Sequence, residues 1–189
     1  AIIPAIDQAL AGIADRYDLE FVFTDNCSSD GSFEILTTMA AEDDRVRVIR
    51  FSRNFGYQKS VLTGYLNSSG ACAAQLDADL QDPPSIIPKF LSEWEAGAKV
   101  VYGVRRSRKE GFFVTAARRL FYRFINFLAE HPLPVDTGDF RLIDRQIIDV
   151  LKTTPSNSPY LRGEIAKMGF RQVGIDYDRA ARKHGDSKF

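Results

Sequence analysis

Apolar and polar positions along the chain predict strands and helices that alternate over its first half. Short runs rich in β-branched and aromatic residues predict strands at residues 19–25, 45–52, 71–77 and 98–104. Apolar residues at helical spacing predict helices before the first of these strands and between them, at residues 2–15, 32–43, 58–70 and 84–97. Alternation of this kind predicts an α/β fold with a mostly parallel sheet flanked by helices.

After residue 104 this alternation stops. The pattern predicts a basic loop that leads into a long amphipathic helix at residues 105–131. Further along, it predicts a short strand and a helix within residues 137–154, and a helix followed by an edge strand within residues 158–182. Parallel sheets bind ligands beyond the carboxyl ends of their strands, so the polar residues at those ends are the first candidates for chemistry.

The composition is typical of one globular domain. The 189 residues are 44% hydrophobic and 26% charged, which excludes a disordered chain and suffices for one α/β core. The net charge is zero, so it does not favour nucleic acid as a partner. Cys27 and Cys72 lie far apart without metal-ligand spacing, which predicts free thiols in a reducing compartment. No apolar run approaches the roughly 18 to 20 residues of a membrane-spanning helix.

The sequence QLDADLQDPP, at residues 75–84, concentrates acidic side chains after a predicted strand. Side chains two positions apart on an extended segment point the same way, so Asp77 and Asp79 can converge on one cation, or one can bind it while the other orients sugar or water. Adjacent carboxylates repel each other, and Mg²⁺ or Mn²⁺ shared with a ligand's phosphates would compensate. Asp82 precedes two prolines, an arrangement that predicts a helix N-cap.

Asp25 ends the first predicted strand and begins the segment TDNCSSDGS. Turn and helix-cap chemistry explains most of this segment, because Ser29, Asp30 or Ser32 can accept hydrogen bonds from the first amides of the next helix. That chemistry does not explain an acidic residue still within the strand. Asp25 is therefore a candidate for ligand binding.

Residues 105–123 carry a local excess of positive charge. Their only acidic residue is Glu110, among the basic residues Arg105, Arg106, Arg108, Lys109, Arg118, Arg119 and Arg123. A solvated helix face accounts for most charge runs of this kind. The interleaved aromatic residues also suit an anionic membrane surface, and both interpretations stay open.

Several sequence blocks occur in the order and approximate spacing of a known family: TDNCSSDGS, FSRNFGYQKSVLTGY, QLDADLQDPP, YGVRRSR, TGDFRL and RAARKHGDSK. With these blocks the chain resembles family 2 glycosyltransferases of the polyprenyl-phosphate type. This group includes dolichyl-phosphate mannose synthases and, with the closer resemblance, bacterial undecaprenyl-phosphate glucosyltransferases. The ordered blocks are far more specific than one Asp-X-Asp motif, which occurs by chance in many proteins.

The resemblance implies a GT-A fold, which is a Rossmann-like, mostly parallel sheet flanked by helices. It also implies an inverting, metal-dependent transfer of a sugar from a nucleotide sugar to a polyprenyl phosphate. The favoured donor is UDP-glucose, with GDP-mannose as the other candidate, and the cofactor would be Mg²⁺ or Mn²⁺. The domain would lie in the cytosol, at the cytoplasmic face of a membrane, and would serve the cell envelope.

The resemblance further assigns roles to residues at matching positions. It implies catalytic roles for Asp79, Asp139 and Arg141, and a metal site formed by Asp77, Asp79 and Gln81. Contacts to the nucleotide sugar are implied for Asp25, Asp77 and Lys188. Contacts to the acceptor phosphate are implied for Arg105, Arg108, Arg179, Arg182 and Ser187.

The chain departs from the family pattern at its ends and in one motif. The family begins with a strand and a turn that help to hold the nucleotide, and this sequence starts after them. We therefore expect a single catalytic domain over residues 1–189 that lacks its first strand and any membrane helices that follow in relatives. Cys27 stands where glycine, which relaxes the backbone, is commoner.

Other functions stay open at this point. A saccharide hydroxyl could replace the polyprenyl phosphate as acceptor, and the fold could serve a non-catalytic binding domain. Phosphatases of the haloacid dehalogenase type also place Asp-X-Asp after a strand, but on their opening strand. No GxGxxG follows a predicted strand, which argues against a dinucleotide-dependent oxidoreductase. A homo-oligomer is neither predicted nor excluded.

Overall fold

The computed structural model describes residues 2–105, 137–154 and 160–179. The chain divides into two compact units, each described by itself below. Unit 1 comprises Ala1–Gly12, Ala74–Leu142 and Arg162–Phe189, and unit 2 comprises Ile13–Ala73 and Ile143–Leu161. The predicted long helix at residues 105–131 lies outside the described residues apart from Arg105, and the single-domain organisation stays a prediction.

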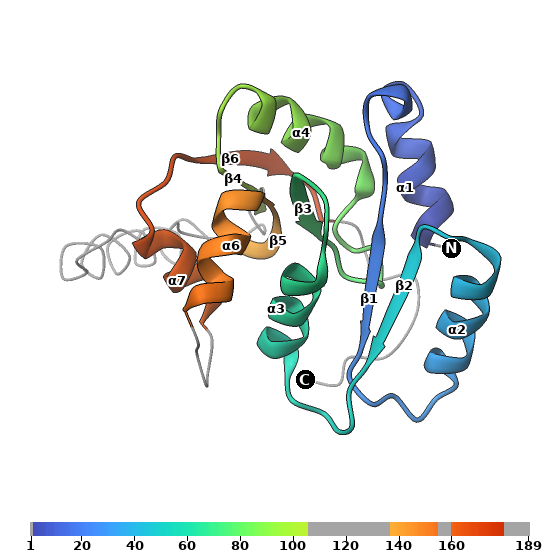
Figure 1. Ribbon diagram of the computed structural model, residues 1–189. Helices are drawn as coiled ribbons and strands as arrows, with labels where there is room; N and C mark the ends of the chain where they lie inside the picture. The colour runs from blue at the N-terminus through green and yellow to red at the C-terminus, as the bar shows by residue number, and fades with distance from the viewer. Residues whose placement is uncertain (1, 106–136, 155–159, 180–189) are drawn as a thin grey trace, which may run out of the picture. The chain divides into compact units, whose positions relative to one another are not determined.

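Unit 2 is built on two parallel strands, β1 (Phe21–Asp25) and β2 (Val46–Arg50), which Figure 1 shows side by side. In their register Asp25 lies opposite Arg50. Helix α2 packs against β2, and helix α3 packs against β1 and against α6. The bounds of the helices in this unit are η1 (Ala14–Arg16), α2 (Ser32–Glu42), α3 (Tyr57–Asn67) and α6 (Arg145–Thr153).

Most of a four-stranded sheet belongs to unit 1, in the order β3, β5, β4, β6. Strands β4 and β6 are parallel, with Arg105 opposite Tyr177, and β6 forms the edge that the sequence predicts. The strands are β3 (Cys72–Gln75), β4 (Val100–Arg105), β5 (Thr137–Asp144) and β6 (Gln172–Tyr177). The helices are α1 (Ile2–Leu10), η2 (Pro84–Ile86), α4 (Ile87–Glu95) and most of α7 (Leu161–Lys167).

The parallel strand pairs and the helices packed on them confirm the predicted α/β fold. Helix α4 packs against both β4 and β6. The chain leaves it through Gly97, the last residue of the predicted helix, whose φ of +95° is the left-handed conformation in which glycine commonly ends a helix. Among the described helices, none combines the length and apolar character that a membrane span requires. Cys27 and Cys72 are both free thiols, as predicted.

The core of unit 1 lies between α4 and the sheet. Phe90 of α4 contacts Phe140 of β5 with their ring centroids 4.8 Å apart, and Phe140 meets the edge of Tyr177 at 5.6 Å. Each fully buried side chain of this size contributes about 1.5 to 3 kcal/mol to folding. Gly103 of β4 is required here, because a Cβ atom at this position would lie 2.5 Å from the Tyr177 ring.

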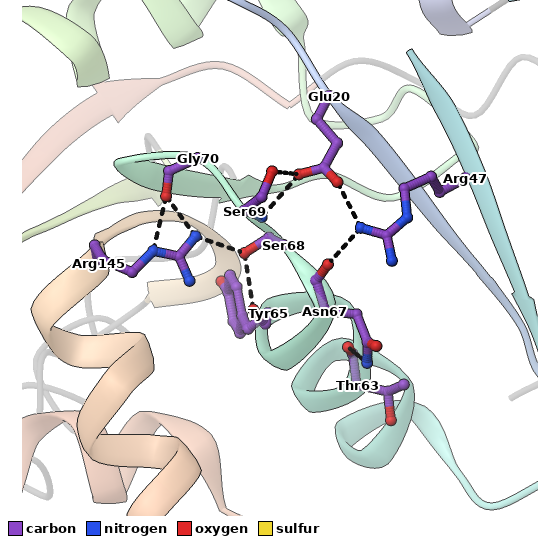
Figure 2. A network of polar contacts seen from close by, with 9 residues as sticks. All are labelled: Glu20, Arg47, Thr63, Tyr65, Asn67, Ser68, Ser69, Gly70 and Arg145. Carbon is purple, nitrogen blue, oxygen red and sulfur yellow. Dashed lines mark hydrogen bonds and ion pairs between the residues drawn. The ribbon is translucent and has the colours of Figure 1, made fainter. Parts of the chain in front are cut away.

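A network of polar contacts in unit 2 fixes the chain between α3 and β3 (Figure 2). One carboxylate oxygen of Glu20 accepts a hydrogen bond from Arg47 Nη1 at 2.8 Å, and the other accepts from the backbone N–H and the hydroxyl of Ser69. The same Arg47 nitrogen donates to the backbone carbonyl of Asn67 at 3.0 Å. This network therefore ties the entry of β1 and strand β2 to the end of α3.

Arg145, the first residue of α6, holds the other side of this connection (Figure 2). Its Nε donates to the backbone carbonyl of Gly70 at 2.8 Å, and its Nη2 donates to the same oxygen and to Ser68 Oγ. Its backbone N–H donates to the carbonyl of Ala71 at 2.8 Å. These bonds satisfy two backbone carbonyls of the segment that connects α3 to β3.

Candidate active site

The acidic motif folds as a tight turn rather than as an extended strand. Strand β3 ends at Gln75, and the N–H of Leu80 donates to the carbonyl of Asp77 at 3.2 Å. The prediction that Asp77 and Asp79 lie on one extended segment is therefore wrong. Both residues follow the end of β3, and Asp79 lies within the turn that the carbonyl of Asp77 closes. Leu80 has a φ of +54°, a left-handed conformation that non-glycine residues adopt at a cost of roughly 1 to 2 kcal/mol.

Both carboxylates of the turn are fixed by neighbouring donors. Asp77 Oδ1 accepts from the side-chain amide of Gln75 at 2.9 Å, and Asp79 Oδ1 accepts from the backbone N–H of Gln81 at 3.1 Å. Within the described ranges no group of three or more His, Cys, Asp and Glu side chains could hold a metal ion. The turn suits a hard cation such as Mg²⁺, which uses one or two protein carboxylates and takes its other ligands from phosphates and water.

Asp82 does not cap a helix, so the prediction of an N-cap is wrong. The residue before η2 is Pro83 and the residue before α4 is Ile86, and neither start has a side-chain cap. Asp82 is instead 2% exposed, and its Oδ1 accepts a hydrogen bond from the hydroxyl of Tyr177 at 2.5 Å. A buried carboxylate requires such partners, because burial penalises its charged form.

Two of the predicted acceptor-binding arginines gather around Asp82. Arg105 lies at the end of β4, with its Nη2 3.9 Å from Asp82 Oδ2 and its Nε donating to the Tyr177 hydroxyl at 3.2 Å. Arg179 follows the end of β6, with its Nε 3.7 Å from Asp82 Oδ1. The sequence interpretation missed Tyr177, whose only signal was its place at the carboxyl end of a predicted strand.

Burial and hydrogen bonds set the protonation of this cluster. Burial raises the pKa of Tyr177, and the hydrogen bond to Asp82 raises it further, to about 12, so the hydroxyl keeps its proton at neutral pH. Burial alone would lower the pKa of Arg105, but the bond to Tyr177 and the charges of Asp82 and Asp77 raise it above its ordinary value. Arg105 therefore stays a cation, and the negative charge of Asp77 contributes to its stabilisation.

Asp139 and Arg141 are neighbours on one side of β5, with Arg141 Nη2 4.0 Å from Asp139 Oδ1. Arg141 is 6% exposed and donates to the carbonyl of Gly138 at 3.2 Å. Arg162, at the start of α7, places its Nε 3.1 Å from the same Asp139 oxygen. Sequence reasoning missed Arg162, and the arrangement shows that two guanidinium groups face the Asp139 carboxylate.

In unit 2, Asp25 ends β1 as predicted and is 4% exposed. Both of its carboxylate oxygens accept from the N–H of Ser28, at 3.1 and 3.3 Å, and its Oδ2 lies 3.5 Å from Arg50 Nε. Asp30 accepts from the N–H of Ser32, which confirms one of the turn contacts predicted there. Cys27 has a φ of +63°, so this residue adopts the left-handed conformation that glycine would adopt without strain.

The segments that follow β1 and β2 are joined by two asparagines that the sequence interpretation missed. Asn26 Nδ2 donates to Asn54 Oδ1 at 2.9 Å, and Asn26 Oδ1 accepts from the N–H of Phe55 at 2.9 Å. The N–H of Gly56 donates to Asn54 Oδ1 at 2.8 Å. These bonds give the carboxyl end of the β1–β2 pair, where Asp25 lies, a fixed shape.

The predicted site residues thus divide into three groups. Unit 1 holds Asp77, Asp79, Gln81, Arg105, Asp139, Arg141 and Arg179, and unit 2 holds Asp25. Arg108, Arg182, Ser187 and Lys188 lie outside the described residues, so their predicted contacts stay predictions. Unit 1 brings Arg105 and Arg179 together around Asp82, and it brings Asp139 and Arg141 together on β5.

Comparison with known sequences gives relatives along almost the whole chain. Residues 2–151 match the family model described as Glycosyl transferase family 2. The uncharacterized glycosyltransferase YkcC of Bacillus subtilis is 40% identical over 185 residues, which are 96% of this chain and 57% of the relative. The bactoprenol glucosyl transferase of Shigella phage SfV is 32% identical over 174 residues, which are 92% of this chain and 57% of the relative. The chain spans just over half the length of these relatives.

Two solved structures share the fold of this chain. The mannosyltransferase PcManGT from Pyrobaculum calidifontis, in complex with GDP-Man and Mn²⁺, has a TM-score of 0.60 and 20% identity, covering 96% of this chain and 55% of that chain. Glucosyl-3-phosphoglycerate synthase from Mycobacterium tuberculosis, in complex with Mn²⁺, UDP-glucose and glycerol 3-phosphate, has a TM-score of 0.57 and 19% identity, covering 96% and 69%. These likenesses confirm the GT-A fold.

Proposed function

Because the chain belongs to glycosyl transferase family 2, we propose that it transfers glucose from UDP-glucose to a polyprenyl phosphate, with inversion at the anomeric carbon. The observation that carries this proposal is the position of an acidic turn beside a pair of arginines in unit 1. Asp82, three residues after Asp79 of the turn, has its carboxylate oxygens 3.9 Å from Arg105 Nη2 and 3.7 Å from Arg179 Nε, so the segment that carries carboxylates suited to a cation leads directly to guanidinium groups suited to a phosphate.

The acidic turn is the proposed donor side. Asp77, Asp79 and Gln81 would hold Mg²⁺ or Mn²⁺, and the bound cation would neutralise the diphosphate that leaves the sugar. The turn supports this role because its backbone is already closed by the Leu80–Asp77 hydrogen bond. Asp25, at the end of β1, and Lys188 are the proposed contacts to the nucleotide part of the donor.

The arginines are the proposed acceptor side. A polyprenyl phosphate is already anionic near neutral pH, so its oxygen can attack the anomeric carbon without a strong general base. The protein then needs to position that phosphate, and Arg105 and Arg179 in unit 1 carry the bidentate donors that suit it, together with Arg108, Arg182 and Ser187. Asp139 and Arg141 would orient the acceptor toward the sugar.

The relatives support a lipid acceptor. The protein of phage SfV is named a bactoprenol glucosyl transferase, and an Escherichia coli protein 31% identical to this chain is named a prophage bactoprenol glucosyl transferase homolog. Both structural neighbours were solved in complex with a nucleotide sugar and Mn²⁺. We extend these properties to this chain, and with them a place at the cytoplasmic face of a membrane, where a polyprenyl phosphate is accessible.

The test uses the full-length protein with undecaprenyl phosphate, Mg²⁺ or Mn²⁺, and one labelled donor at a time: UDP-glucose, UDP-N-acetylglucosamine or GDP-mannose. We expect label in a lipid-linked product with UDP-glucose, and its loss when a chelator removes the metal.

Asp79→Asn should lower the rate by at least about 100-fold, because this carboxylate would hold the cation at the leaving group. Asp149→Asn, on the exposed side of α6, is the matched control and should keep the rate. If none of the donors yields a lipid-linked product, the proposal is refuted.

A further inference from the structure

Tyr177 has a position that its surroundings determine closely. It ends β6 opposite Arg105, it is 2% exposed, and its ring meets Phe140 edge to face at 5.6 Å. The ring lies against Gly103, where a Cβ atom would be 2.5 Å from it. With the ring held on two sides, the hydroxyl can occupy only a small region between β4 and the segment that follows the acidic turn.

The hydroxyl joins a cation to an anion within that region. It accepts a hydrogen bond from Arg105 Nε at 3.2 Å and donates one to Asp82 Oδ1 at 2.5 Å. The other oxygen of Asp82 faces Arg105 Nη2 at 3.9 Å. Arg105, Tyr177 and Asp82 therefore form a closed triangle, and only a protonated hydroxyl can both donate and accept in this way.

Gly138 of β5 leaves space for the guanidinium group of Arg105. A Cβ atom at Gly138 would lie 2.8 Å from Arg105 Nη2, so any larger residue there would displace the side chain. Arg179 reaches the same carboxylate independently, with its Nε 3.7 Å from Asp82 Oδ1. Asp82 is thus the common partner of two arginines that come from the ends of adjacent parallel strands.

The arginines keep part of their surface for a ligand. The side chains of Arg105 and Arg179 are 36% and 34% exposed, whereas that of Asp82 is 3% exposed. A guanidinium group has five N–H donors, and one buried carboxylate cannot engage the donors of both. The charge of Asp82 neutralises one of the two arginine charges. A cation bound at the turn would neutralise Asp77, so the second arginine charge would stay available to a ligand.

We propose that Tyr177 and Asp82 are positioning residues that hold Arg105 and Arg179 as a preformed pair for the phosphate of the acceptor. This inference rests on the proposed function and adds Tyr177 and Asp82 to it. For Asp82, the positioning role takes the place of the helix-cap role that the sequence predicted. Arginine side chains lose much rotamer freedom when they bind a ligand, so a pair that is ordered beforehand binds the same phosphate more tightly.

The first test compares two buried tyrosines. Tyr177→Phe keeps the ring and removes the hydroxyl, and Tyr65→Phe does the same in unit 2, where Tyr65 is 3% exposed. We expect Tyr177→Phe to raise KM for undecaprenyl phosphate about tenfold, the size of a lost hydrogen bond to a charged group, while KM for the nucleotide sugar stays within about twofold. Tyr65→Phe should change neither KM.

The second test asks whether Tyr177 acts through Arg105. In an Arg105→Lys background the hydroxyl has lost its guanidinium partner, so adding Tyr177→Phe should raise KM for undecaprenyl phosphate by less than about twofold more. Independent, multiplying effects of the two substitutions would overturn the inference. So would a Tyr177→Phe enzyme whose KM values for both substrates equal those of the wild type.

A third readout does not depend on activity. The Nε–H of Arg105 should give a distinct NMR signal that is protected from exchange with water in the wild type and in Tyr65→Phe. Tyr177→Phe should remove this protection, and an unchanged signal would overturn the positioning role whatever the acceptor is. A wild-type enzyme that makes no lipid-linked sugar would refute the proposed function, while this signal would still decide the role of Tyr177.

Discussion

Two groups of arginines and carboxylates, one in each unit, use their hydrogen-bond donors differently. In unit 2, Arg47 and Arg145 donate at 3.0 and 2.8 Å to backbone carbonyls of the segment between α3 and β3 (Figure 2). In unit 1, Arg105 and Arg179 approach the single carboxylate of Asp82 at 3.9 and 3.7 Å and stay about a third exposed. Arginines bonded to the backbone hold the chain together, whereas arginines gathered around one buried carboxylate can still bind a ligand.

The largest effect expected from this comparison is on folding. Arg145→Ala removes the donors to Gly70 and Ser68, so it should lower the free energy of unfolding by about 2 kcal/mol, which is typical for hydrogen bonds from a charged group. Denaturant unfolding measures this change. Both KM values should stay within about twofold of the wild type, because Arg145 belongs to the connection and not to the site. A changed KM with unchanged stability would contradict the structural role given to Arg145.

The counterpart in unit 1 should show the opposite behaviour. Arg179→Ala removes one of the two cations that face Asp82, so we expect KM for undecaprenyl phosphate to rise about tenfold. The free energy of unfolding should change by less than about 1 kcal/mol, since a partly exposed ion pair contributes little to stability. Steady-state kinetics and denaturant unfolding of the same preparation test both statements. A large loss of stability with an unchanged KM would make Arg179 a structural residue.

The pH dependence of stability sharpens the comparison in unit 2. Burial raises the pKa of Glu20, but the hydrogen bonds from Ser69 and Arg47 outweigh it, and the pKa falls below its ordinary value of 4.5. The unfolded chain therefore binds more protons than the folded chain between these two pKa values. The contribution of Glu20 is present above pH 4.5 and is lost as the pH falls through the folded pKa.

The measurement is the free energy of unfolding between about pH 3 and pH 7, for the wild type and for Glu20→Gln. In Glu20→Gln, the free energy of unfolding should decrease less steeply than in the wild type as the pH is lowered through the acid end of this range. Glu34→Gln, which removes another glutamate of unit 2 without touching the network, is the control and should keep the slope of the wild type. Equal slopes for all three proteins would show that the network does not depend on the charge of Glu20.

The smallest effect concerns the left-handed residue beside Asp25. Cys27→Gly should raise the free energy of unfolding by up to about 1 kcal/mol, because glycine adopts a φ of +63° without the strain of a side chain. Thermal unfolding measures it. Cys27→Ser keeps the Cβ atom at the same φ and should give no gain. A gain in Cys27→Ser equal to that in Cys27→Gly would trace the effect to the thiol.

The sequence predicted the fold well because strand and helix patterns are local. The order of strands and helices, the end of a helix near residue 97 and the edge position of β6 agree with the sequence pattern. The register that places Arg105 opposite Tyr177 could not be predicted, because it depends on which strands pair across the sheet. The four-stranded order likewise joins segments that are distant along the chain.

The contacts of the candidate site residues could not be predicted from the sequence, and their functional roles stay predictions. Local reasoning correctly placed Asp25 at a strand end, but it made Asp82 a cap because two prolines follow. The partner that decides the role of Asp82 is Tyr177, which lies far along the chain and carries no motif. Arg162 and the Asn26–Asn54 pair were missed for the same reason, since each acts only through a contact between distant segments.

The measurement that tests the central claim most directly is a competition between acceptors. The full-length protein receives labelled UDP-glucose, Mg²⁺ or Mn²⁺, and equal amounts of undecaprenyl phosphate and a soluble oligosaccharide in one vessel. We predict that the label enters the lipid fraction as a glucosyl phosphate and that Arg105→Ala strongly reduces it. Label that enters the oligosaccharide instead, at a rate that Arg105→Ala leaves unchanged, would contradict the account.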